Sequence, residues 1–169
     1  MTSTIDGRID AAEFRQVLSH YASGITVIAG IADDAPVGFT CQSFYSVSTT
    51  PPLVSFSVMK TSTSWPQIRD TGRFSVNVLS GHQHDVSNTF ARSGTDKWAG
   101  IEWHRSPQEN PIIEGTVMWL DCEVVAEHEA GDHTIVIGHV RAMSSPDWHH
   151  GSPLLYFRGS YRHLDDLTG

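Results

Sequence analysis

Apolar and polar residues alternate with a period of two along much of the chain, a spacing typical of β-strands that bury one face. In the segment 117–128, for example, Met118 and Leu120 fall on one face and more polar residues fall on the other. Turn-forming residues around Asp33 and Gly131 separate neighbouring runs and predict hairpins. The predicted strands cover 25–31, 36–44, 53–59, 73–79, 117–128, 133–143 and a C-terminal segment, 154–164, that closes the sheet.

Three short segments have a helical pattern instead. In the segment 10–21, apolar residues recur at helical spacing after Asp10, and Glu13 gives the start the form of a capping box. A short helix is predicted after Trp65, with proline in its first turn and glycine just past its end, and another over 84–92. The apolar positions of the first helix are Phe14, Val17, Leu18 and Tyr21.

These elements amount to six or seven strands with few helices. Because the helices do not alternate regularly with the strands, a doubly wound parallel sheet fits the chain poorly. We therefore predict one mainly β domain over residues 1–169, built as an antiparallel barrel.

Composition narrows the class of protein and of partner. Of the 169 residues, 39% are hydrophobic and 18% are charged, as in folded globular domains. The net charge of −8 and the scattered basic residues argue against nucleic acid as a partner. The apolar runs are too short to cross a membrane, and the N-terminus shows no secretory signal pattern. With only Cys41 and Cys122, we expect a reduced, cytoplasmic protein, although the sequence leaves a disulfide between them open.

Two hydroxyl-rich segments are candidates for a ligand site. The segment 38–53 carries six Ser or Thr hydroxyls, and 60–66 carries four more beside Lys60, just before the short predicted helix. Hydroxyls and backbone N–H groups in such places can bind a flat heterocycle or a phosphate. Each segment also has an interpretation without a ligand: a Ser/Thr-rich turn for the first and ordinary helix capping for the second.

The sequence has no G-x-G-x-x-G, G-x-x-x-x-G-K-[ST], H-E-x-x-H or G-x-S-x-G motif, so a Rossmann-type dinucleotide site is not supported. His82 and His84, like the pair His149 and His150, lack a convincing metal-ligand spacing, and we predict no metal site. His133 follows a Gly-Asp turn and is the first residue of a predicted strand. From the sequence, an ordinary turn residue and a functional site residue are equally good interpretations of it.

Nine stretches, in order, resemble the flavin reductase family with the FMN-binding split-barrel fold, and more narrowly the reductase components of two-component aromatic monooxygenases. They run from about Phe14 to Tyr161: SGITVIAG, PVGFTCQSFYSVSTTPPLVSF, KTSTSW, GRFSVNVL, DKWAGIEW, NPIIEG, DCEV, GDHTIVIGHV and PLLYFRGSY. The resemblance implies an antiparallel split β-barrel that reduces free FMN or FAD with NADH or NADPH. It also implies a homodimer, and a separate oxygenase that receives the reduced flavin by diffusion and hydroxylates an aromatic compound.

The resemblance further implies a role for particular residues. The flavin ring and ribityl chain would be lined by Thr40, Cys41, Gln42 and Ser43. The phosphate would be surrounded by Ser57, Lys60, Thr61, Ser62 and Ser64. The remaining implied residues are Phe90 and Lys97, in the block that closes over the cofactor, His133 beside the nicotinamide, and Tyr161 as an aromatic near the pocket. Two departures stand out: relatives carry small residues and Asn where this chain has Cys41-Gln42, and Phe where it has Trp98.

Three other functions compete with flavin reduction. One is a non-catalytic flavin-binding or electron-carrier protein on the same fold, which would bind flavin without oxidising NAD(P)H. The second is an oxidase of the pyridoxamine-phosphate type, which needs a more cationic phosphate site than KTSTSW provides. The third is a purely structural module, which would leave the two hydroxyl-rich segments without a purpose.

Overall fold

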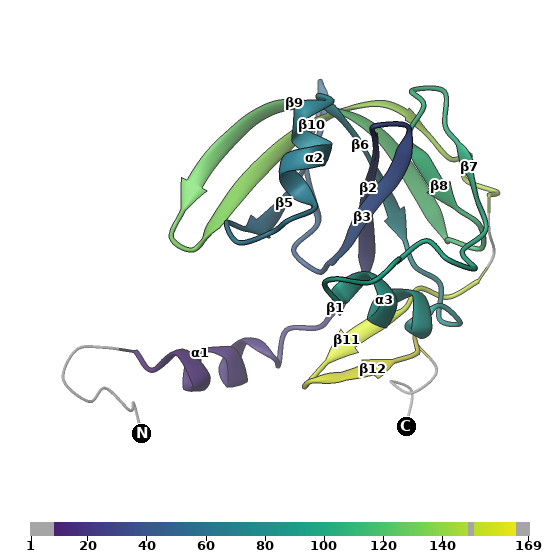
Figure 1. Cartoon of the computed structure of the whole chain (residues 1–169). Helices are drawn as coiled ribbons and strands as arrows, with labels where there is room; N and C mark the ends of the chain where they lie inside the picture. Colours follow the sequence, from purple (N-terminus) through teal and green to yellow (C-terminus); the bar gives the residue numbers. More distant parts are fainter. Residues whose placement is uncertain (1–8, 149–150, 165–169) are drawn as a thin grey trace.

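The computed structural model describes residues 9–148 and 151–164, and most of these residues form antiparallel strands (Figure 1). The main sheet within them has seven strands. In spatial order these are β3 (Ala35–Cys41), β2 (Thr26–Ala32), β6 (Arg73–Val78), β9 (Met118–Ala130), β10 (His133–Met143), β5 (Pro52–Met59) and β4 (Tyr45–Thr49). Each strand runs antiparallel to its neighbours. The predicted antiparallel, mainly β architecture and both predicted hairpins are confirmed.

Smaller elements complete the described part of the chain. One small sheet joins β1 (Ser23–Gly24), β11 (Leu155–Phe157) and β12 (Ser160–Arg162), and a second pairs β7 (Trp103–Arg105) with β8 (Pro111–Ile113). The helices are α1 (Ala11–Leu18), α2 (Trp65–Asp70) and α3 (His84–Ala91). The prediction that 154–164 closes the main sheet is wrong, because this segment pairs with β1 and with itself. Strands β4, β7 and β8 were not predicted, since each is short and β4 consists largely of exposed hydroxyl-bearing residues.

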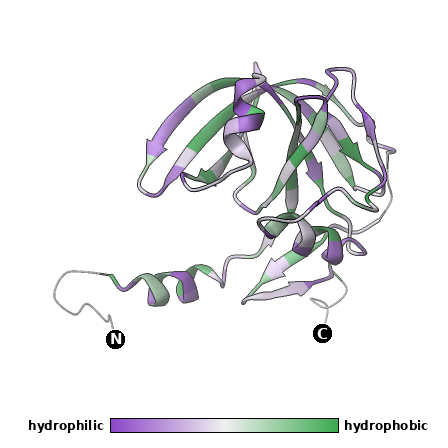
Figure 2. Ribbon diagram, viewed as in Figure 1, coloured by the Kyte–Doolittle hydropathy of each residue, from purple (hydrophilic) through white to green (hydrophobic). Residues whose placement is uncertain are grey.

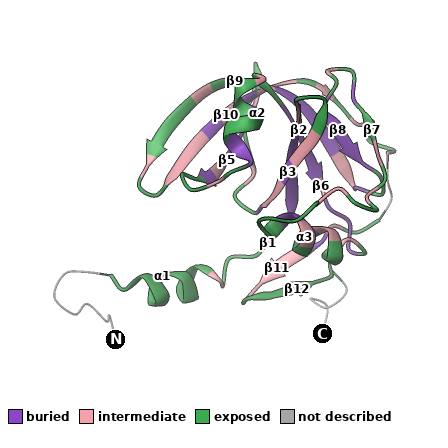
Figure 3. Cartoon of the chain, in the orientation of Figure 1, coloured by how far each residue is buried: buried purple, intermediate pink, exposed green. Residues whose placement is uncertain are grey.

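Two apolar clusters stabilise the fold. Inside the curled main sheet, Phe56 of β5 contacts Trp65 of α2 and Phe74 of β6 edge-on, with ring centroids 5.2 and 5.3 Å apart. Helix α2 thus covers one side of the barrel with its buried residues Trp65 and Ile68 (Figure 3). The second cluster joins Phe90 of α3 to Leu154 and to neighbouring apolar side chains of β2. The strands accordingly carry much of the apolar sequence (Figure 2).

Helix α1 stands apart from this body. It begins at the predicted cap, where the Asp10 carboxylate accepts hydrogen bonds from two backbone N–H groups, but it ends at Leu18 and not at Tyr21. None of its residues is buried, and it projects away from the barrel (Figures 1 and 3). Its predicted apolar face therefore has no partner within the described chain: Phe14, Val17, Leu18 and Tyr21 are all exposed.

The two cysteines are both buried and both free, which answers the question of a disulfide that the sequence left open. Among the described residues, no helix has the length and apolar character needed to span a bilayer.

Candidate functional site

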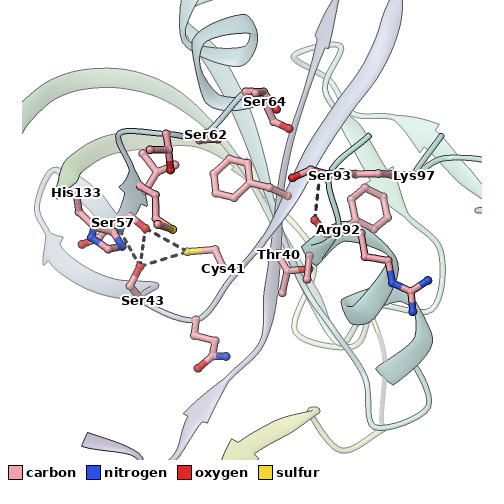
Figure 4. Close-up of a pocket in the computed structure, with 18 residues that line it drawn as sticks. Thr40, Cys41, Ser43, Ser57, Ser62, Ser64, Arg92, Ser93, Lys97 and His133 are labelled. Atoms are coloured by element: carbon pink, nitrogen blue, oxygen red, sulfur yellow. Dashed lines mark hydrogen bonds between the residues drawn. The ribbon is translucent and has the colours of Figure 1, made fainter. Parts of the chain in front are cut away.

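One cavity of about 490 Å³ lies where β3 and β5 end and β10 begins, between the turn after β5 and the loop after α3. Figure 4 shows His133, Ser57 and Ser43 on one side of it and Arg92, Ser93 and Lys97 on the other. The structure brings together every predicted site residue except Lys60 and Tyr161. Those that line the cavity are Thr40, Cys41, Gln42, Ser43, Ser57, Thr61, Ser62, Ser64, Phe90, Lys97 and His133.

The wall nearest the expected flavin ring is fixed by Ser43, just after β3. Its hydroxyl accepts a hydrogen bond from the Ser57 N–H at 2.8 Å and donates to the Ser57 carbonyl at 3.0 Å. The Cys41 sulfur lies 3.3 Å from the same hydroxyl, and burial raises the pKa of this thiol. Cys41 is therefore a neutral, weakly polar group, and Ser43 connects β3 to β5 and shapes the wall between them.

Thr40 and Tyr161 hold helix α3 in place through side-chain hydrogen bonds. The Thr40 hydroxyl donates to the Ser87 carbonyl at 2.6 Å. The Tyr161 hydroxyl bonds to the Ser87 hydroxyl and to the Asn88 side-chain oxygen, at 2.9 and 2.8 Å. Tyr161 does not line the cavity, so the structure places it behind α3, where it holds the helix that carries Phe90.

The turn after β5 supplies four consecutive hydroxyl side chains to the cavity, Thr61 to Ser64. The Ser62 N–H donates to the Met59 carbonyl at 2.9 Å, which closes the turn. The Ser62 hydroxyl also accepts from the Trp65 N–H at 3.2 Å, so helix capping and cavity lining coexist at this residue. Ser64, in contrast, makes no side-chain capping bond, and its hydroxyl is available to a ligand.

Lys60 does not reach the cavity. Its ammonium group lies 3.6 Å from the Glu129 carboxylate and lines a separate, neighbouring groove. Lys60 and Thr61 are the two central residues of the turn that the Ser62 N–H to Met59 carbonyl bond closes, and they line different hollows. The predicted contact of Lys60 with the phosphate of the flavin is therefore not supported by this arrangement.

Two cationic side chains line the opposite side, Lys97 and Arg92. The Lys97 ammonium donates to the carbonyls of Gly38 and Phe90, each at 3.1 Å, and its partial burial lowers the pKa of the amine. It thereby connects β3 to the end of α3 and leaves one N–H for a ligand. Arg92 and Ser93 were not predicted, although their place between α3 and Lys97, in the block expected to close over the cofactor, was a usable signal.

His133 stands at the mouth of the cavity as the first residue of β10, opposite Met59 in the register of the sheet. Its Nδ1 lies 2.7 Å from a carboxylate oxygen of Asp132. This hydrogen bond lowers the pKa of Asp132, which keeps the carboxylate ionised and the imidazole ring oriented. The ring nitrogen left for a ligand is Nε2, and the role of His133 beside the nicotinamide stays a prediction.

No cluster of three or more metal-ligating side chains occurs in the described ranges 9–148 and 151–164. Within them, His84 pairs with Asp85 at an exposed position. His149 and His150 lie outside the described residues.

Comparison with known proteins assigns the chain to a family. Residues 18–165 match the flavin reductase like domain. Over 161 residues the chain is 45% identical to the flavin-dependent monooxygenase reductase subunit HsaB of Mycobacterium tuberculosis, covering 95% of this chain and 86% of that protein.

Solved structures agree. Nitrilotriacetate monooxygenase component B from Mycobacterium thermoresistibile superposes with a TM-score of 0.89 at 40% identity, over 94% of this chain and 88% of that one. The NADH:FAD oxidoreductase SgcE6 of Streptomyces globisporus, solved with NAD and FAD fragments, gives 0.86 at 30% identity, over 95% and 96%. The split-barrel fold expected from the resemblance is confirmed. On the evidence of the domain match and of these relatives, the chain belongs to the flavin reductase family.

Proposed function

We propose that this chain uses NADH to reduce free flavin, which then leaves for a separate oxygenase. The observation that carries the proposal is the lining of the cavity, where neutral hydrogen-bonding groups surround a space with His133 at its mouth. The uncharged wall of Thr40 to Ser43 suits a neutral heterocycle, and the hydroxyls of Thr61 to Ser64 suit a phosphate. The residues present therefore fit a flavin.

Each part of the cavity then has a task. The segment from Thr40 to Ser43 positions the ring, Ser62 and Ser64 hold the phosphate, and His133 orients the nicotinamide through Nε2. A bound flavin supplies a hydride acceptor, so the protein needs no nucleophile of its own. The contribution of the chain is to hold two flat rings in contact and to keep water from between them.

Release of the product follows from the same lining. Arg92 is exposed, and two of the three ammonium protons of Lys97 are already donated to backbone carbonyls. The turn proposed to hold the phosphate, Thr61 to Ser64, contributes hydroxyls and no arginine, so the phosphate has no bidentate clamp there. A modest affinity for flavin is suited to an enzyme that must release reduced flavin to a separate oxygenase.

The deciding experiment mixes the purified protein with NADH and FMN or FAD and follows the loss of NADH absorbance. We expect catalytic turnover with NADH, the donor named for the relatives. Flavin binding without NADH oxidation would favour the electron-carrier alternative and would overturn the proposed activity.

The phosphate role of the turn is tested by the double variant Ser62→Ala/Ser64→Ala. Because hydrogen bonds to a charged group are lost, we expect the Kd for FMN to rise about tenfold and that for riboflavin, which has no phosphate, to change less than about twofold. Fluorescence quenching of each flavin by the protein measures both constants. Equal losses for the two flavins would place the phosphate elsewhere.

We also propose that the protein is a homodimer in which α1 packs on the second copy. The support is the unpartnered apolar face of α1, on which Val17 and Leu18 are 64% and 53% exposed. A charge placed in that face, Val17→Asp, is expected to convert the dimer to a monomer, measured by light scattering after gel filtration. Gln16→Asp adds the same charge on the opposite face of the helix and should leave the dimer intact. A wild-type monomer, or a Val17→Asp dimer, would contradict the assignment.

The partner and location are proposals of the same kind. Relatives named as reductase subunits of flavin-dependent monooxygenases support a separate oxygenase as recipient of the reduced flavin. That its substrate is aromatic stays a prediction from the resemblance. A cytoplasmic location is supported by the two free thiols and by the proposed use of NADH.

A further inference from the structure

A second hollow, a groove of about 200 Å³, adjoins the flavin cavity. The two share Met59 and Ser62 as lining residues, so they meet at the turn that follows β5. The groove also contains two cations, Lys60 and Arg69, and two carboxylates, Glu127 and Glu129. The function proposed above makes no use of these four side chains.

The turn places the junction at the phosphate end of the cavity. Its conformation is held by the bond from the Ser62 N–H to the Met59 carbonyl and by one from the Lys60 N–H to the Asp132 carbonyl, at 2.9 and 3.0 Å. Thr61 lines the cavity, and its neighbour Lys60 lines the groove. A phosphate bound by the hydroxyls of Thr61 to Ser64 thus lies next to the rim of the groove.

We propose that this groove receives the adenylate half of FAD and makes FAD the preferred flavin; the inference rests on the flavin reduction proposed above. In FMN the terminal phosphate ends the molecule, whereas in FAD it continues into a second phosphate, a ribose and an adenine. Lys60 and Arg69 neutralise the second phosphate at the rim. Glu127 and Glu129 accept hydrogen bonds from the ribose hydroxyls, as acidic residues do in other dinucleotide sites.

The charges in the groove are available for this purpose. Lys60 is paired at 3.6 Å with Glu129, whose side chain is 88% exposed, and Arg69 is paired with its exposed neighbour Asp70 at 3.4 Å. Such exposed pairs contribute little, so turning the cations toward a phosphate costs little. Glu127 is more firmly placed, because its carboxylate accepts the indole N–H of Trp65 at 2.8 Å.

The test compares FAD and FMN binding in the wild type, in Lys60→Met, in Arg69→Met and in the double variant. We expect the wild type to bind FAD more tightly than FMN, and the double variant to lower the ratio of the two affinities about five- to tenfold. Adenosine 5′-monophosphate serves as the probe of the groove alone, and it should compete with FAD more strongly than with FMN. Arg73→Met removes one positive charge outside this groove and should leave the ratio unchanged.

The outcomes separate the two proposals. If both flavins bind and are reduced but the ratio is unaffected by the double variant, the adenylate site is wrong and the flavin reduction stands. If Lys60→Met weakens FAD and FMN equally, Lys60 belongs to the phosphate that both flavins share, and the groove has no part in selection. If neither flavin binds, the proposed function itself fails.

Discussion

Replacing His133 with alanine is expected to lower kcat/KM for NADH by roughly 30- to 100-fold, because a misplaced nicotinamide loses most of the benefit of orientation. His133 lies at the mouth of the cavity with Nδ1 bonded to Asp132, so only its Nε2 faces a ligand. The Kd for flavin should stay within about twofold, since the walls that hold the flavin are separate from this residue. Stopped-flow reduction of bound flavin by NADH, with a parallel flavin titration, measures both quantities.

Two further variants make this expectation specific. His128→Ala removes an exposed histidine from β9, outside the cavity, and should leave hydride transfer unchanged. Asp132→Asn weakens the orientation of the His133 ring and should lower kcat/KM less than His133→Ala does. Normal turnover in His133→Ala would remove this residue from the mechanism and leave it as a turn residue.

Replacing Gly138 with alanine is expected to lower the free energy of unfolding by about 2–3 kcal/mol, as overpacking of a filled core does. An added Cβ at Gly138 would collide with the ring of Phe74, lying only 2.9 Å from its Cε1, and would stand 3.3 Å from the Cβ of Cys122. Phe74 cannot yield easily, because it is fully buried and packs edge-on against Phe56. Urea unfolding followed by tryptophan fluorescence measures the loss.

Gly24→Ala is the matched control for this effect. A Cβ added at Gly24 meets nothing within 4 Å, so this variant should be as stable as the wild type or slightly more stable. A Gly138→Ala protein with wild-type stability would mean that β9, β10 and β6 are packed less tightly around Phe74 than the structure shows.

Most of the strand pattern was readable before the structure. The run 117–128 was predicted to bury one face; β9 forms there, but Trp119 to Cys122 are all buried, so both faces of this part of the strand are covered. The turn at Gly131, where φ is 63°, suits glycine and closes the hairpin as predicted. The C-terminal segment was misplaced because an alternating pattern says that a strand has a buried face but does not say which strand it pairs with. Strand β4 was not predicted, because its exposed hydroxyl-bearing residues have the composition of a turn.

For the site, residue types were predictable and their final neighbours were not. The hydroxyl segments around Thr40 and Ser62 come from separate strand ends, and only the curling of the sheet brings them together. Lys60 and Thr61 are adjacent in the chain, yet they line different hollows. Tyr161 was expected at the pocket and lies behind α3.

The class of fold, its hairpins and the chemical character of the site were predictable from residue order, because periodicity, turn residues and hydroxyl content are local properties of the chain. The apolar face of α1 was predictable in the same way. Long-range folding leaves this face without a partner within the described chain, brings Arg92 into the cavity and puts Lys60 in the groove beside it. The physical reason is that strand register and sheet curvature set the side on which each residue emerges, and both depend on contacts between residues far apart in the chain.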